Sequence, residues 1–306
     1  MSGLEDAVLY GPPSATGTPT AAGVSRAVAQ ARAALNAGAY RQLAAALPQQ
    51  LALADALARE GEVPEGLSTL YATAARAAIK AGDDRLLAVA ADRAVQTARE
   101  GGHALALAEA YRMVSSSYRR AGRYDRAVQV AVRAADELAS DRSAAAAAAR
   151  ASVQGQLLAT AAYTAAKNED REGARDMLAQ AGAAADRTCA ELTGHAWFGP
   201  RQVALHEVSV RQVLGDPPGA VAAARRVDTR GMPPERAARL GLDVARAYAH
   251  WGKSGGCYRA LLAIERAAPQ EVRRSSAHAL TRELLRHERH LHGIRDFARR
   301  TGALAG

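Results

Sequence analysis

Two histidines near the C-terminus have a spacing that could serve metal binding. His287 and His290 are three residues apart, so both could lie on one face of a helix as metal ligands. The charged residues Glu288 and Arg289 accompany them, and this composition is more typical of a solvated helix surface. We therefore predict that the chain holds no metal ion.

A second candidate for chemistry is the adjacent pair His206 and Glu207, which could exchange protons with a substrate. More often, an adjacent histidine and glutamate only form a polar pair at the edge of a groove. The glycines between Gly11 and Gly17 lack the spacing and the lysine of a phosphate-binding loop, and no Gly-x-Gly-x-x-Gly is present. We predict a protein that binds rather than catalyses, with no catalytic residue and no cofactor.

The composition favours closely packed helices over a β-sheet. The chain of 306 residues contains 49 % apolar and only 4 % aromatic residues, and alanine is the strongest helix former. A net charge of +9 would suit an anionic partner such as nucleic acid. However, only three of the 40 basic residues are lysines, and arginine, alanine and glycine all have GC-rich codons. Codon usage therefore accounts for part of the charge, and a nucleic-acid surface is not the favoured interpretation.

The sequence also carries signals about the compartment. Two cysteines, Cys189 and Cys257, are too few for a disulfide framework and suit a reducing environment. No apolar run approaches the length of a membrane span, and the N-terminus lacks the order of charged and apolar residues found in a secretory signal. We expect a cytoplasmic protein with no membrane partner.

The elements that would position these side chains are helices, and the stretch from Tyr111 to Leu138 shows them most clearly. Apolar or small residues recur at helical spacing on both sides of one tight turn. Gly122 can take the left-handed conformation that ends a helix, and Asp125 is acidic in the first turn of the next helix. Similar breaks recur 37 to 47 residues apart, at Ala37-Gly38, Ala81-Gly82, Ala121-Gly122, Lys167-Asn168, Leu214-Gly215 and Trp251-Gly252.

This hairpin resembles the tetratricopeptide repeat (TPR). In that family an aromatic residue, an apolar and small pair, and a second aromatic residue precede the turn glycine, and a small residue follows; here these are Tyr111, Val114, Ser115, Tyr118 and Ala127. The resemblance implies an all-α fold, a right-handed TPR-like solenoid of helical hairpins. We expect residues 1–20 to be a linker or lead-in. Residues 21–306 would form five to six divergent helix pairs and end in a capping helix over about 270–290 and 294–300.

In a TPR array the first helix of each pair lines the concave face. Counting from the turn glycines places several arginines on that face, with Glu109 as its only carboxylate. Arginine binds carboxylates and phosphates through paired hydrogen bonds, so the resemblance implies a groove for an anionic small molecule or short peptide. A solvated helix face is the alternative. The candidate ligand-binding residues are Arg76, Arg112, Ser116, Arg119, Tyr163, Gln202, His206, Ser209 and Arg246.

A second resemblance spans most of residues 21–290. The segment Trp197-Phe198-Gly199-Pro200, the helix after it and Leu214-Gly215-Asp216 are similar to the C-terminal TPR region of actinobacterial XRE-family regulators, which carry a helix-turn-helix domain. In that family Thr-Asn follows Phe-Gly-Pro, whereas this chain has Arg201-Gln202, a departure that could alter the choice of ligand. Pro200 suits a first helical turn, and Trp197 and Phe198 either form a structural cap or close a pocket.

The second resemblance implies a module that senses a ligand and passes its state to transcription. Nothing before Gly11 is long enough to hold a helix-turn-helix domain, so nucleic acid would be contacted only through a domain that is absent from this chain. A homodimer is compatible with this role. The alternative is a scaffold whose groove holds a peptide segment of a partner protein, and an enzyme is the third hypothesis.

Overall fold

The computed structural model describes residues 2–61, 64–140, 147–188 and 198–304, and within them the chain is all-α, without a strand. The chain divides into two compact units. Unit 1 comprises Met1–Leu35 and Tyr40–Val203, and unit 2 comprises Asn36–Ala39 and Ala204–Gly306.

The helices follow one another along the chain in the order of their labels. The first nine are α1 (Ser2–Leu9), α2 (Ala21–Asn36), α3 (Tyr40–Arg59), α4 (Glu65–Ala81), α5 (Asp84–Glu100), α6 (Ala104–Arg120), α7 (Tyr124–Ser140), α8 (Ala147–Lys167) and α9 (Arg171–Ala185). The remaining ones are α10 (Pro200–Val213), α11 (Pro217–Arg225), α12 (Pro234–His250), α13 (Ser254–Ala267), α14 (Ser275–Leu285) and α15 (Ile294–Thr301), with single 3₁₀ turns at Glu271–Arg273 and Glu288–His290.

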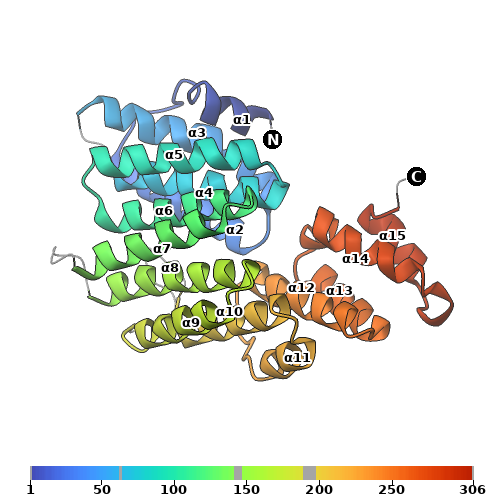
Figure 1. Cartoon of the computed structure of the whole chain (residues 1–306). Helices are drawn as coiled ribbons and strands as arrows, with labels where there is room; N and C mark the ends of the chain where they lie inside the picture. Colours follow the sequence, from blue (N-terminus) through green and yellow to red (C-terminus); the bar gives the residue numbers. More distant parts are fainter. Residues whose placement is uncertain (1, 62–63, 141–146, 189–197, 305–306) are drawn as a thin grey trace. The chain divides into compact units, whose positions relative to one another are not determined.

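Consecutive helices pack as hairpins. In unit 1, α4 packs against α5, α6 against α7 and α8 against α9, and successive pairs meet through α5–α6 and α7–α8. Figure 1 shows α5, α6, α7 and α8 lying side by side in this order. In unit 2, α12 and α13 form a further pair. The predicted all-α architecture of packed helix pairs is confirmed.

All six predicted breaks separate helices. At five of them a glycine has a φ between 70° and 79°, the left-handed conformation that ends a helix: Gly38, Gly82, Gly122, Gly215 and Gly252. The helix starts that follow three of the breaks are capped by aspartates. Asp83, Asp170 and Asp216 each accept a hydrogen bond of 2.9 Å from the amide three residues later. Local backbone chemistry therefore sets the hairpin turns.

The break at Asn168 lacks a glycine, and Glu169 takes its place with a φ of 62°; no other non-glycine residue in the described ranges has a positive φ. A residue with a Cβ is strained in this conformation by roughly 1–2 kcal/mol. We expect Glu169→Gly to raise the free energy of unfolding by about 0.5–1 kcal/mol, after allowing for the greater freedom of glycine in the unfolded chain. Urea denaturation followed by circular dichroism measures the change. Glu169→Ala keeps a Cβ and should give no such gain, and equal gains in both variants would contradict this explanation.

The N-terminal segment is helical over part of its length. Ser2–Leu9 forms α1, which packs against α3 and α5 and buries Leu4, Ala7 and Val8. The reason is the spacing of these three residues, which places them on one helical face. Residues 11–20 contain no helix. The domain boundary at residue 20 stays a prediction.

The C-terminal segment is helical. The stretch predicted as one helix over about 270–290 is divided into shorter pieces, whereas α15 (Ile294–Thr301) covers the stretch predicted over 294–300. Arg274 is extended, with φ −81° and ψ 151°, and separates the 3₁₀ turn at Glu271–Arg273 from α14. Gly293 has a φ of 80° and precedes α15. Phe297 on α15 is fully buried and meets the ring of Tyr258 on α13 edge to face, with centroids 5.8 Å apart. This aromatic contact thus packs α15 against α13 within unit 2.

None of the helices in the described part of the chain combines the length and the apolar composition needed to cross a membrane.

Candidate ligand-binding site

Three neighbouring helices of unit 1 carry five of the predicted site residues. Helix α6 packs against both α4 and α8, and these helices supply Arg76 (α4), Arg112, Ser116 and Arg119 (α6), and Tyr163 (α8). We call these five residues the α4–α6–α8 face. The guanidinium carbon of Arg119 lies 5.2 Å from the centroid of the Tyr163 ring, a distance suited to a cation–π contact. The structure therefore brings together two residues that are 44 positions apart in the sequence.

The α4–α6–α8 face is less exposed than a solvated helix surface. The three arginines and Tyr163 are half-buried, and Ser116 is buried. The Ser116 hydroxyl donates a hydrogen bond of 3.0 Å to the carbonyl of Arg112. Because its proton is used within α6, Ser116 can serve a ligand only as an acceptor. The arginines and Tyr163 are thus the stronger candidates for contacts with a ligand.

Glu109 adds an unusual feature on α6, one turn before Arg112. Its Oε1 atom is buried and accepts no hydrogen bond from the described residues. Leaving a buried acceptor unsatisfied costs about 1–3 kcal/mol, and such groups are rare in folded proteins. A ligand that donates a hydrogen bond here would remove this cost.

A second polar cluster lies in unit 2, between α10 and α12. The Ser209 hydroxyl donates a short hydrogen bond to Oδ2 of Asp243, and Nη1 of Arg246 lies 3.0 Å from Oδ1 of the same carboxylate. Ser209 and Asp243 are 1 % and 5 % exposed. Farther along the same two helices, Nε2 of Gln212 and Nδ1 of His250 are 3.4 Å apart. Arg246 is therefore engaged by a carboxylate that sequence reasoning missed.

The other two predicted residues, Gln202 and His206, are buried side chains of α10 rather than open groove positions. Gln202 is 2 % exposed, and its Oε1 atom accepts no hydrogen bond from the described residues. By the division of the chain, Gln202 belongs to unit 1, whereas His206, Ser209 and Arg246 belong to unit 2. Six of the nine predicted residues thus belong to unit 1 and three to unit 2.

Phe198 has a structural role. Its ring is fully buried in a cluster with Val153, Leu157 and Ala161 of α8. A Cβ on Gly155 would lie 2.0 Å from Cε1 of the ring, so the ring packs directly on the backbone of α8. This contact favours the structural-cap interpretation of Phe198. Trp197 lies outside the described residues.

Among the described residues there is neither a metal site nor a reactive thiol. No group of three or more His, Cys, Asp and Glu side chains is placed to hold a metal ion there. Burial raises the pKa of Cys257 to about 12, and the negative charge of Glu283 adds to the shift. The Cys257 thiol is therefore protonated at neutral pH and is a poor nucleophile. Cys189 lies outside the described residues.

Sequence reasoning also missed a short serine motif in unit 2. Gly252-Lys253-Ser254-Gly255-Gly256 has Gly-x-Ser-x-Gly spacing. Ser254 lines a cavity together with His287, one of the two histidines first considered as metal ligands. The motif itself was the available signal, but the stretch was interpreted only as a helix break.

No protein-family model and no curated protein matches the chain. The fold therefore defines the class: an all-α protein built from packed, consecutive helical hairpins.

Proposed function

We propose that the chain is a TPR-like sensing module that binds an anionic small molecule or short peptide at the α4–α6–α8 face. The supporting observation is that three half-buried arginines and Tyr163 lie on helices that pack against one another, with Arg119 in contact with the Tyr163 ring. An arginine held against an aromatic ring keeps its planar fork oriented for a carboxylate or phosphate. Partial burial strengthens the interaction, because the charges are less screened by water.

We also propose a more specific fold than the packed helix pairs described above. The packed hairpins would continue as a right-handed TPR-like solenoid, in which small rotations between neighbouring pairs accumulate. A ligand that binds one curvature better would shift the population towards it. The resemblance around Phe198-Gly199-Pro200 leads us to propose that a cytoplasmic, XRE-type regulator reads this change. An upstream coding sequence without a helix-turn-helix segment would argue against that part.

Replacing Arg119 by alanine should weaken the binding of an anionic ligand at least about tenfold, or about 1.4 kcal/mol. The change removes both the charge and the contact with Tyr163. Isothermal titration calorimetry with citrate, inorganic phosphate and a short acidic peptide measures the effect on the full chain.

The matched control is Arg126→Ala, which removes an exposed arginine of α7 in the same unit. It lowers the net charge equally but leaves the α4–α6–α8 face intact, so binding should stay within about twofold of the original. If both variants weakened ligand binding equally, the lower net charge alone would explain the loss, and the α4–α6–α8 face would not be needed. Absence of saturable binding to every probe would contradict the proposed function. Binding of the peptide alone would favour the scaffold hypothesis.

A further inference from the structure

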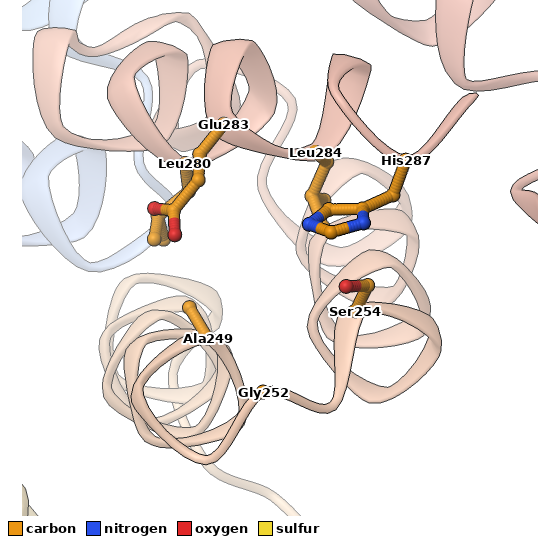
Figure 2. A pocket seen from close by; sticks show the side chains of 7 residues that line it. All are labelled: Ala249, Gly252, Ser254, Leu280, Glu283, Leu284 and His287. Atoms are coloured by element: carbon orange, nitrogen blue, oxygen red, sulfur yellow. The ribbon is translucent and has the colours of Figure 1, made fainter.

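Unit 2 contains a cavity of about 140 Å³ between the end of α12, the start of α13 and α14. Ala249, Leu280 and Leu284 form its apolar wall, and Ser254, Glu283 and His287 supply polar side chains. Figure 2 shows the imidazole ring of His287 above the hydroxyl of Ser254, whereas the Glu283 carboxylate lies above Ala249. A hydroxyl, an imidazole and a carboxylate thus line one small cavity.

The backbone around Ser254 has the features of a nucleophile turn. In hydrolases with Gly-x-Ser-x-Gly, the serine lies on a sharp turn that leads into a helix, and the acid and the histidine follow it in the chain. Here Gly252 makes the turn with a φ of 70°, Ser254 is the first residue of α13, and Glu283 and His287 follow in that order. The preceding element is a helix, not a strand, so the likeness is confined to the turn and the helix start.

The start of α13 also offers donors for a developing negative charge. The amides of Ser254 and Gly255 donate no hydrogen bond to a described residue, and Lys253 provides no side-chain cap. In the hydrolases the amide of the residue after the serine stabilises the oxyanion, and that residue here is Gly255. Donors that are fixed before the reaction stabilise such an anion without reorganisation.

We propose that Ser254 and His287 form a site for acyl transfer from small esters. The Ser254 hydroxyl oxygen forms a bond to the ester carbonyl carbon while His287 takes the hydroxyl proton. The bond to the alcohol oxygen then breaks, and His287 returns the proton to the leaving alcohol. Water attacks the acyl-serine in the second half, releases the carboxylic acid and regenerates Ser254. Glu283 is one helical turn before His287 and lines the same cavity.

The cavity selects the size of the acyl group. Pockets that hold drug-sized ligands measure about 300–1,000 Å³, so 140 Å³ admits only a group of a few heavy atoms. The side chains of Leu280 and Leu284 suit a methyl or ethyl end. Acetyl and propionyl esters are therefore the substrate class, and esters of long fatty acids are excluded. This site uses residues of unit 2 alone and does not depend on ligand binding at the α4–α6–α8 face.

The test is acylation of the full chain by p-nitrophenyl acetate, followed by release of p-nitrophenol and by peptide mass spectrometry. We expect one acetyl group on the peptide that contains Ser254. The rate of release should fall at least about tenfold in Ser254→Ala and in His287→Gln, as for removal of a nucleophile or its base. p-Nitrophenyl octanoate should react at least about tenfold more slowly than the acetate, because its acyl chain exceeds the cavity.

Two matched controls separate this chemistry from unspecific reaction with surface groups. Ser275→Ala removes another serine that begins a helix in unit 2, and His290→Gln removes an exposed histidine three residues from His287. Both should keep the original rate, and thermal unfolding checks that all variants fold. An unlabelled Ser254, or a loss of rate in a control equal to that in Ser254→Ala or His287→Gln, would overturn the proposal.

Discussion

Replacing Gly155 by alanine should lower the free energy of unfolding by about 3 kcal/mol, at the upper end of the usual range for overpacking a core. The added Cβ would lie 2.0, 2.6 and 2.8 Å from three carbons of the Phe198 ring. No side-chain rotation relieves this clash fully, because the ring is completely buried against α8. Either the ring must leave its site or the backbone of α8 must move. Urea denaturation of the purified chain measures the loss.

A glycine elsewhere provides the control for this variant. Gly182 lies within α9, and a Cβ added there meets no atom within 4 Å. Gly182→Ala should therefore stabilise the protein by about 0.5–1 kcal/mol, because alanine favours the helix. If both alanine variants changed stability in the same direction and by the same amount, helix propensity rather than contact with Phe198 would be the cause.

A double-mutant cycle tests the contact directly. Phe198→Ala alone should cost about 3–5 kcal/mol through the cavity that it leaves. In the double variant Gly155→Ala/Phe198→Ala the new methyl group enters this space, so the total loss should be smaller than the sum of the single losses. Additive losses would show that Gly155 and Phe198 do not pack against each other in solution.

The helix boundaries could be predicted from sequence because they depend on local chemistry. A glycine that takes a positive φ, followed by an aspartate or proline at the next helix start, marks a turn wherever it occurs, as at Gly82-Asp83 and Gly215-Asp216-Pro217. Counting from the turn glycines placed Arg119 and Tyr163 on the same predicted face, but it did not predict their contact. Glu169 shows the limit, because nothing in its residue type favours the left-handed conformation that it adopts after the end of α8.

The interactions that sequence could not predict depend on how far a side chain is buried. Counting from the turn glycines placed Arg246 on the ligand face, yet its guanidinium lies against the buried carboxylate of Asp243. Asp243 was missed because a single acidic residue among apolar residues of a helix is normally interpreted as exposed to solvent. Only the approach of α10 reveals that its carboxylate meets Ser209.

Replacing Asp243 by alanine should cost about 3 kcal/mol of unfolding free energy, within the range for breaking a buried charged pair by removing one partner. The variant leaves the buried Ser209 hydroxyl without its acceptor carboxylate, and Arg246 loses its counter-charge while its side chain is only 32 % exposed. Asp243→Asn keeps an oxygen for Ser209 but removes the charge, so its loss should be smaller, about 1–2 kcal/mol. Urea denaturation of the three proteins ranks them.

Unit 2 offers a nearly identical ion pair at its surface as the control. Asp296 and Arg299 are also three residues apart on one helix, with nitrogen and oxygen 2.9 Å apart, but their side chains are 72 % and 65 % exposed. Asp296→Ala should therefore cost less than about 1 kcal/mol, because water screens and replaces the interaction. The two pairs share geometry and sequence spacing, so a difference in cost measures the burial of Asp243 together with its contact with Ser209. Equal costs at both sites would mean that the contact of Asp243 with Ser209 adds nothing to the stability of unit 2.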